Sequence, residues 1–446
     1  MKYIRYEESR PVAIRAMLAE TPTAYLPIGP LGWEGEGVPL GQAGIRARRF
    51  CEEAAARTGG VVFPPLYWRG FGTGRLPFTF EFDPAPMEHV VEEGLLQLAN
   101  WGFEKTVVCD GSGSTPLREM LAEECDRVRG AGEKGAPIEI ARVSSLEEES
   151  TVADQPLLRE VDEEQSAGTE TFIRFEESVP KQVAALVERS PIAYVPLGAL
   201  EWHGEHGPLG LDGVKAHHIC ERAAEQTGGV VFPTIFWGAF DTMPFPFTFH
   251  FERKHLESLV HQLLPQLSDW GFEAIVLLTG HYPPTQIKML KDACRSFNGE
   301  GRAISLGTPE MGFATDIDYF GDHAGMWESS IMLAIQPDWV DLSAMPRGLS
   351  AMERLIRHGT MGKDPISRAS AEKGRVAIDH IVTGLSNAVR RVMADQNDDA
   401  FETVYEAYAK AIRVFSPRVF YLIREALDVH SIGDLVRYLR WTSRNS

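Results

Sequence analysis

AYLPIGPLGWEGEGVPLG, at residues 24–41, returns as AYVPLGALEWHGEHGPLG at residues 193–210, and the difference between positions 24 and 193 is 169. The same offset aligns further segments, among them RTGGVVFPPLYW with QTGGVVFPTIFW, LPFTFEF with FPFTFHF, and NWGFEKTVVCDG with DWGFEAIVLLTG. No gap is needed until about residue 126. The chain therefore contains a duplicated domain rather than a short solenoid repeat.

Within each copy, strand-like and helix-like segments alternate. AYVPLG, GVVFPTI and AIVLLTG are short apolar runs of strand length, whereas VKAHHICERAAEQ and RKHLESLVHQLLPQLSDW have helical spacing. Strands separated by helices predict an α/β fold with a largely parallel central sheet, present here in two tandem copies. In such sheets the loops that leave the carboxyl ends of the strands carry the chemistry.

A strongly acidic segment separates the two copies. Residues 144–171 hold nine acidic side chains and a single arginine, which is typical of a solvated linker. The sequence thus predicts four parts: a first copy at 1–140, a linker at 141–171, a second copy at 172–395 and a helical extension at 396–446.

The composition narrows the class of protein. The 446 residues carry a formal net charge of −19, which disfavours non-specific binding to nucleic acid or to an anionic membrane. No run approaches the length of a membrane span, and the N-terminus lacks the apolar core of a secretory signal. The five cysteines form no CxxC pair, so we expect reduced thiols in a cytoplasmic protein.

The duplication supplies an internal control for function. Where the first copy has Gly32, Glu34, Gly37 and Ala43, the second has four polar residues: Glu201, His203, His206 and Asp212. Farther along, His281 replaces Ser112, and the segment DHAGMWESS adds Asp322, His323 and Glu328. Residues common to both copies can be explained by the scaffold, but these cannot.

Imidazole and carboxylate groups together favour a divalent metal, either Zn, Mn or Fe(II). Residues two apart in an extended loop, such as Glu201 and His203, can address one shared centre or two neighbouring ions. An aspartate such as Asp212 can bridge two ions. The alternative is that these histidines are ordinary residues satisfied by hydrogen bonds, but their joint absence from the first copy favours the metal.

Three segments carry a resemblance to a known family. LGALEWHGEHGPLGLD, TGHYPP and DHAGMWESS, in this order, resemble the signature segments of the creatininase family of metal-dependent amidohydrolases. The resemblance covers about residues 172–345 and implies creatininase-like layered domains. The first copy resembles the same fold with its signature erased.

Carried over position by position, the resemblance implies roles for individual residues. The implied metal ligands are Glu201, His203, Asp212, His281 and Glu328, with one or two divalent ions bound and Asp212 bridging. The implied catalytic residues are His323 and Glu328, and the implied substrate-binding residues are Tyr282 and His206. One departure stands out, since creatininase has a metal-binding glutamate where this chain has Pro283. Either Glu328 completes the second metal site, or only one ion binds firmly.

The resulting hypothesis is hydrolysis of an amide-type C–N bond in a small cyclic amide, a formamide or a peptide-like substrate. The alternatives are hydrolysis of a keto-cyclitol or sugar lactone, including C–C cleavage, and a non-catalytic scaffold with a vestigial site. Symmetric assembly is common in the family, so the resemblance also implies a homo-oligomer. The first copy is then expected to take the place of a neighbouring subunit.

Overall fold

The structure of the protein is a computed structural model. It describes residues 2–67, 76–112, 115–131, 138–142, 170–298, 303–317, 319, 321–414, 428–429 and 431–445. Most of the linker predicted at 141–171 therefore lies outside the described residues.

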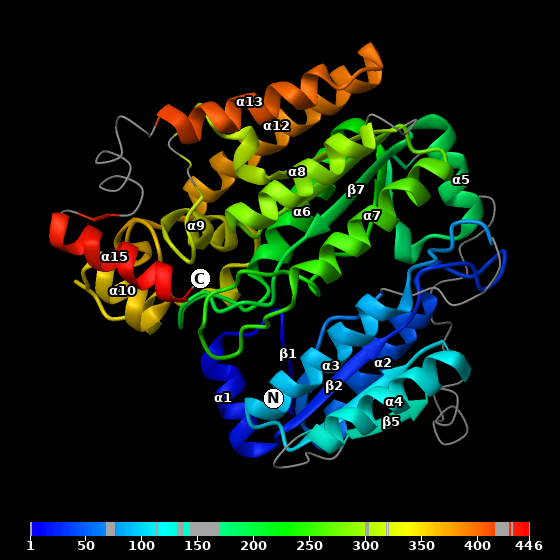
Figure 1. Cartoon of the computed structure of the whole chain (residues 1–446), viewed down its shortest axis with the longest axis horizontal. Helices are drawn as coiled ribbons and strands as arrows, with labels where there is room; N and C mark the ends of the chain where they lie inside the picture. Colours follow the sequence, from blue (N-terminus) through cyan, green and yellow to red (C-terminus); the bar gives the residue numbers. More distant parts are fainter. Residues whose placement is uncertain are drawn as a thin grey trace.

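Two five-stranded sheets, one in each copy, form the centre of the fold (Figure 1). The first has the order β1-β3-β2-β4-β5, from β1 (Tyr3–Arg5), β2 (Thr23–Ile28), β3 (Gly60–Val62), β4 (Lys105–Asp110) and β5 (Ile138–Arg142). The second has the order β10-β9-β7-β8-β6, from β6 (Phe172–Arg174), β7 (Ile192–Leu197), β8 (Gly229–Val231), β9 (Ala274–Thr279) and β10 (Ile304–Pro309). All neighbouring strands are parallel, which confirms the predicted fold class. The boundary predicted at residue 140 falls inside β5.

Helices connect the strands in both copies. The first copy contains α1 (Pro11–Glu20), α2 (Gln42–Thr58), α3 (Pro84–Asn100) and α4 (Thr115–Ala131). The corresponding helices of the second copy are α5 (Pro180–Arg189), α6 (Leu211–Thr227), α7 (Arg253–Asp269) and α8 (Pro284–Asn298). The chain then adds α9 (Met326–Ile335), α10 (Ala351–His358), α11 (Pro365–Arg368), α12 (Ala371–Asp395), α13 (Asp399–Val414) and α15 (Ile432–Asn445). Short 3₁₀ turns lie at Phe175–Glu177, Glu310–Phe313, Pro337–Trp339 and Leu342–Ala344.

The same local signals set these elements in both copies. Proline at the first position begins α1 and α5, where no intrahelical N–H bond is needed. The repeated Thr-Gly-Gly sequence ends α2 and α6, with Gly59 at φ 85° and Gly228 at φ 78°. Glycine tolerates this left-handed backbone, so the chain can turn directly from the helix into β3 or β8.

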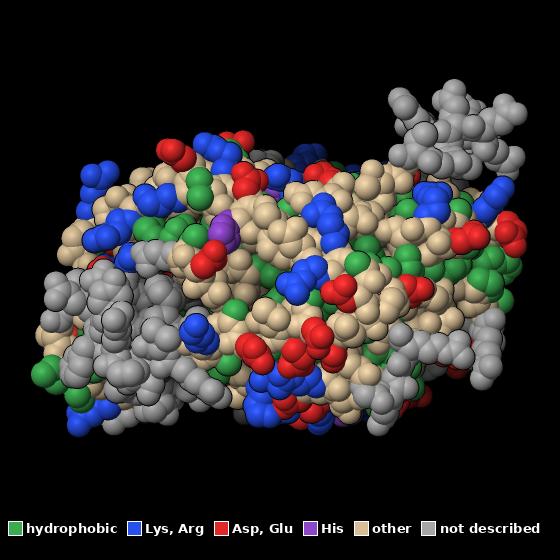
Figure 2. All heavy atoms as spheres, turned by 90° about the horizontal axis from the view of Figure 1, so that it is seen from above, with side chains coloured by type: hydrophobic (Ala, Val, Ile, Leu, Met, Phe, Trp, Pro, Cys, Tyr) green, Lys and Arg blue, Asp and Glu red, His purple; other side chains and the backbone are tan. Residues whose placement is uncertain are grey.

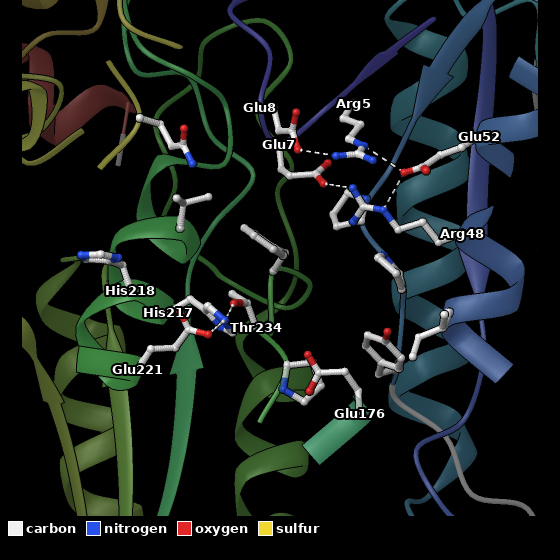
Figure 3. Close-up of a pocket in the computed structure, with 18 of the residues that line it drawn as sticks. Arg5, Glu7, Glu8, Arg48, Glu52, Glu176, His217, His218, Glu221 and Thr234 are labelled. Atoms are coloured by element: carbon white, nitrogen blue, oxygen red, sulfur yellow. Dashed lines mark hydrogen bonds and ion pairs between the residues drawn. The ribbon is translucent and has the colours of Figure 1, made fainter. Parts of the chain in front are cut away.

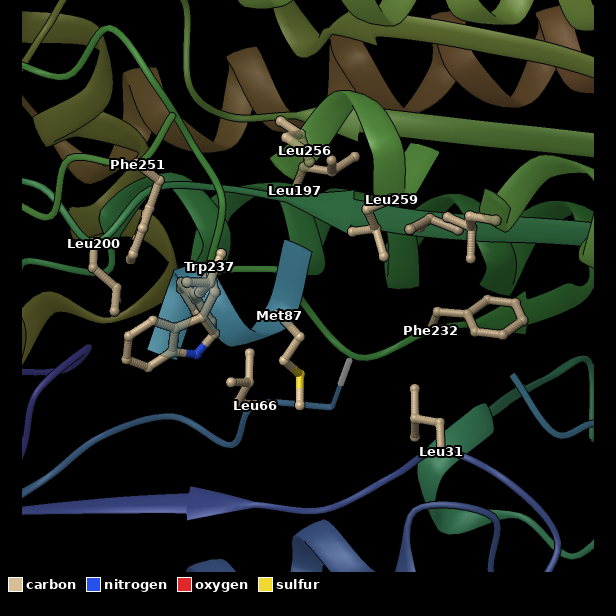
Figure 4. Packing of buried hydrophobic residues seen from close by; sticks show 14 of the residues in the cluster. Leu31, Leu66, Met87, Leu197, Leu200, Phe232, Trp237, Phe251, Leu256 and Leu259 are labelled. Atoms are coloured by element: carbon tan, nitrogen blue, oxygen red, sulfur yellow. The ribbon is translucent and has the colours of Figure 1, made fainter. Parts of the chain in front are cut away.

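Each buried strand supplies side chains to two separate cores. In β7, Ile192 and Tyr194 face a core shared with α6, α9, α12 and α13. The alternating residues Val195 and Leu197 face the opposite way, into a core that includes residues of both copies. Figure 4 shows this joint core, in which Leu31, Leu66 and Met87 of the first copy pack with seven labelled residues of the second.

The two copies dock by a nearly symmetric set of backbone hydrogen bonds. Leu209 N and Gly210 N donate to Ser9 O and Glu7 O at 2.9 and 3.0 Å. The equivalent pairs, Leu40 N to Ser178 O and Gly41 N to Glu176 O, have the same two lengths in the opposite direction. A reciprocal contact of this kind is typical of a two-fold dimer interface, formed here within a single chain.

Charged side chains of both signs lie on the surface, and the cysteines lie in the interior. On the face drawn in Figure 2, acidic and basic side chains are interspersed rather than gathered by sign. Among the residues the structure describes, no helix has both the length and the apolar character that a membrane crossing requires. All five cysteines are described, buried and free of disulfides.

Candidate metal centre

The polar residues singled out from the sequence lie at the carboxyl ends of adjacent strands. Glu201, His203 and His206 follow β7, and Asp212 lies in the first turn of α6. His281 follows β9, which pairs with β7, and the loop before α9 and its first turn add His323 and Glu328. The loops that leave parallel strands meet at one edge of the sheet, and they bring these residues together across more than a hundred positions.

A close approach of backbones fixes the geometry at this edge. A Cβ atom on Gly280 would lie 2.1 Å from the carbonyl oxygen of Asp212, so only glycine lets the end of β9 pass the start of α6. The equivalent Cβ on Gly111 would lie 1.8 Å from the carbonyl oxygen of Ala43. The scaffold of the centre is therefore the same in both copies.

Three histidines of the centre are oriented in the same manner. Each directs one ring nitrogen to a backbone carbonyl at 2.8–3.0 Å: His203 to Glu201, His281 to Phe240, and His323 to Trp202. A carbonyl oxygen only accepts, so the histidine N–H donates and the other nitrogen of the neutral ring keeps its lone pair. These free nitrogens face carboxylates, which is the arrangement of metal-binding histidines held by backbone groups.

The carboxylates complete the set of donors. Glu201 Oε2 and Asp212 Oδ2 are buried and accept no hydrogen bond. His281 Nδ1 lies 3.0 Å from the first oxygen and 3.2 Å from the second. A lone pair that faces two carboxylate oxygens is repelled unless a cation or a proton lies between them. The donor set therefore fits a divalent metal ion of the Zn or Mn type.

Six of the predicted residues converge in three overlapping groups, all buried. In each group the potential ligand atoms lie within 4.8 Å of one another. The groups are Glu201, Asp212 and His281; Glu201, His203 and His323; and His203, Asp212 and Glu328. The spatial cluster expected from the sequence is thus present.

The electrostatics of the centre favour a positive charge. Burial alone would lower the pKa of His281, but Glu201 and Asp212 outweigh it and raise that pKa to about 10. Burial likewise opposes the charged form of His203, whose pKa Asp212 nevertheless raises to about 9. The carboxylates thus stabilise the protonated form of each ring. A divalent cation bound at the same place would be stabilised by the same negative charges.

The two residues predicted to bind the substrate, His206 and Tyr282, lie beside the cluster. His206 is buried, contacts Ala324 O and Ser329 Oγ at 3.0 Å, and belongs to none of the three groups. It connects the first signature segment to the third, and burial lowers its pKa to about 4. Tyr282 is half-buried, and its hydroxyl contacts Lys215 Nζ at 2.7 Å. Their roles in substrate binding stay predictions.

Sequence reasoning missed Lys215 and Glu310. Both side chains are fully buried, and Lys215 Nζ lies 3.1 Å from Glu310 Oε1. The sequence contained a signal for each of them. Lys215 follows Asp212 by three residues on the same helix, so the two side chains lie on the same face of that helix. Glu310 directly follows the end of β10, just as His281 comes shortly after the end of β9.

Comparison with known proteins identifies the family. The creatininase family, described as creatinine amidohydrolase, matches residues 7–166 and again residues 176–389. Together these segments cover most of the chain. The protein belongs to the creatininase family. The two separate matches confirm the duplication, and the first shows that the copy without the ligand set is also a creatininase-family domain.

Individual relatives of this creatininase-family chain align with about half of it. Creatinine amidohydrolase of Pseudomonas putida is 26% identical over 236 residues, covering 45% of this chain and 88% of the relative. The mycofactocin precursor peptide peptidase of Mycolicibacterium smegmatis is 28% identical over 246 residues, covering 49% and 92%. A solved structure of creatinine amidohydrolase covers 50% of this chain and 97% of its own at 25% identity, with a TM-score of 0.43. Another solved creatininase is described with manganese, at 25% identity and a TM-score of 0.43 over 49% and 97% of the two chains.

A cavity of this creatininase-family chain lies elsewhere, between the two copies (Figure 3). It encloses about 550 Å³, and residues at equivalent positions of the two copies face each other across it. Such pairs include Glu7 with Glu176, Arg48 with His217, Arg49 with His218, and Glu52 with Glu221. None of the metal-centre residues lines it, so the cavity is a feature of the docking between copies.

Proposed function

We propose that the second copy is a metal-dependent hydrolase of an amide-type C–N bond. The observation that carries this proposal is the common orientation of His203, His281 and His323, each tied to a carbonyl and each presenting its other nitrogen to buried carboxylates. Glu201, Asp212 and His281 would hold the ion, because two of their oxygens have no other partner. A divalent ion in such a position lowers the pKa of water and polarises a carbonyl group.

In the proposed reaction, His323 transfers the proton. His323 is the most exposed of the clustered histidines, at 9%, and its Nδ1 lies 4.0 Å from Glu201 Oε2. It is therefore placed to receive the proton of an attacking water and to give it to the leaving nitrogen as the C–N bond breaks. The products are a carboxylic acid and an amine, so atoms and protons balance.

Glu328 is less suited to move a proton. Its Oε1 binds the ammonium of Lys215, and its Oε2 accepts the N–H of Ala324 at 2.7 Å. Because both oxygens are engaged by donors, we assign Glu328 a positioning role. It holds Lys215 and the turn that carries His323.

The chemistry of the centre and the names of the relatives support one class of substrate. One relative is named for creatinine, a cyclic amide, and two are named as peptidases of a peptide precursor. Hydrolysis of an amide-type bond is common to both activities, so we propose a small cyclic amide or a short peptide as the substrate.

The test begins with metal content. Elemental analysis of the full chain should find bound Zn, Mn or Fe, and the Glu201→Ala/His203→Ala double variant should lose it. A screen of creatinine, N-formyl compounds and short peptides should then reveal hydrolysis by the wild type alone. Absence of metal in the wild type, even after incubation with Zn²⁺, Mn²⁺ and Fe²⁺, would refute the proposal and favour the scaffold alternative.

A further inference from the structure

The proposed reaction leaves one buried cation of the centre without a role. Lys215 has no exposed surface, and its ammonium group bonds to Glu328 Oε1 and to Tyr282 OH. It also lies 3.1 Å from Glu310 Oε1 and 3.8 Å from Asp212 Oδ1. A buried lysine is costly unless it is paired and hydrogen-bonded, and here three carboxylates surround it.

The ammonium divides the centre into two unlike halves. Around His281, the oxygens Glu201 Oε2 and Asp212 Oδ2 lack any hydrogen-bond donor. Around Lys215, both oxygens of Glu328 have donors, from Lys215 Nζ and from the N–H of Ala324. Among the described residues, no lysine or arginine pairs with these two oxygens of the first half, whereas the second half contains the permanent charge of the Lys215 ammonium.

A second metal ion would have to use the half that Lys215 occupies. The donors available there are His203, Asp212 and Glu328. Two of these residues, Asp212 and Glu328, are also partners of the ammonium. An ion bound to their oxygens would lie close to a fixed positive charge in a buried place, where like charges repel strongly. The turn after β9 offers no replacement ligand, because Pro283 has no side-chain donor.

The first copy contains a second example of the same arrangement. Arg46 stands at the position equivalent to Lys215. Its Nη2 binds Glu34 Oε2 and the carbonyl oxygen of Gly111, each at 2.9 Å. Glu34 and Gly111 are equivalent to His203 and Gly280. On this turn of the helix, each copy therefore directs a side-chain cation into the place where the centre is built.

We propose that the ammonium of Lys215 takes the place of a second metal ion, so that the centre binds a single divalent ion. That ion would be held by Glu201, Asp212 and His281. Lys215 then neutralises Glu310 and Glu328, and Asp212 faces the metal with Oδ2 and the lysine side with Oδ1. This inference rests on the proposed function and specifies its metal stoichiometry.

The test measures metal stoichiometry and the Mn²⁺ electron paramagnetic resonance spectrum on the full chain, with no assay of activity. The protein is stripped with a chelator, loaded with Mn²⁺ and desalted. The wild type should retain about one equivalent with the spectrum of an isolated ion. Lys215→Met should retain about two equivalents, with the exchange-coupled spectrum of a carboxylate-bridged pair. Lys288→Met, which removes an exposed lysine of α8, is the matched control and should match the wild type.

The outcomes separate this inference from the proposed function. Two equivalents and a coupled spectrum in the wild type would overturn the inference and leave the proposed function intact. No metal in the wild type would overturn both. A folded Lys215→Met protein that still binds one isolated ion would also overturn the inference, because the lysine would then not be what excludes the second ion. If Lys215→Met does not fold, Lys215→Gln serves in its place, and the wild-type spectrum alone still decides between one ion and two.

Discussion

The two copies of this chain share a scaffold but differ in what they bury. Both have the same order of strands and the same glycine at the crossing of strand and helix. The second copy buries Glu201, Asp212, Glu310 and Glu328 beside one lysine, whereas the first has glycine and alanine at the two positions that align. In the first copy, Arg46 pairs instead with Glu34. The fold therefore does not require these carboxylates. Their burial calls for compensating positive charge, which Lys215 supplies in part and which the proposed metal ion would complete.

The largest effect should come from separating the copies. Removal of residues 1–142 would uncover apolar surface of the second copy, since Phe63 and Phe80 pack against Trp237 and Phe232. An exposed patch of this kind causes association or aggregation. Size-exclusion chromatography with light scattering should find insoluble or oligomeric material. A soluble monomeric fragment with full metal content would instead show that the first copy is dispensable.

The next test removes an equivalent side chain from each copy. His281→Ala should abolish tight metal binding and lower kcat/KM for the identified substrate at least about a thousandfold, since a catalytic metal contributes several kcal/mol. The matched variant Ser112→Ala, at the same position of the first copy, should leave both quantities within about twofold of the wild type. Elemental analysis and steady-state kinetics measure them. Equal losses in the two variants would contradict the assignment of the centre to the second copy.

A smaller effect should come from Glu176, a glutamate between the two copies that is equivalent to Glu7 but lacks its arginine partner. Glu7 pairs with Arg48 at 2.6 Å, but the residue equivalent to Arg48 in the second copy is His217. Burial raises the pKa of Glu176 to about 7. A carboxyl whose pKa is higher in the folded state destabilises the fold as pH rises from about 4.5 to about 7, and the full cost is present above that range.

Glu176→Gln should therefore raise the free energy of unfolding by about 2–3 kcal/mol at pH 8 and change it little at pH 4.5. Urea denaturation at the two pH values measures the difference. The exposed neighbour supplies the control, since Glu177→Gln should shift stability by less than about 0.5 kcal/mol at either pH. A gain of the same size at pH 4.5 would show that burial of the charge is not the cause.

The smallest effect concerns a contact that only one copy makes. Arg15 of the first copy binds Glu205 at 2.5 Å and lies 5.9 Å from the ring centroid of Trp202, both in the loop that follows β7. The equivalent residue of the second copy is Ala184, which offers no such contact to the first. Arg15→Ala should lower stability by about 0.5–1 kcal/mol. A double-mutant cycle with Glu205→Ala measures the coupling, and a coupling of zero would assign the loss to packing alone.

Much of the fold and of the centre could be predicted from the sequence because the signals are local or repeated. The apolar runs of β7 and β9 are continuous because both faces of these strands are buried, and that pattern alone indicates a parallel sheet. The contrast between His281 and Ser112 needed only the alignment of the two copies. The roles of His206 and Tyr282, by comparison, rested on resemblance, and the structure adds their contacts without testing those roles.

By itself, the sequence determined that the chain is a duplicated α/β protein and that its second copy carries histidines and carboxylates that the first copy lacks at the aligned positions. These conclusions depend on periodicity and on residue identity, which can be read along the chain. The tertiary structure alone decided that Lys215 meets Glu310 and that the first copy bonds to the loop of Glu201 through Ser9. Such contacts join residues that are distant along the chain. They form because parallel strands gather their ends at one edge, and because two apolar faces, one from each copy, are buried together.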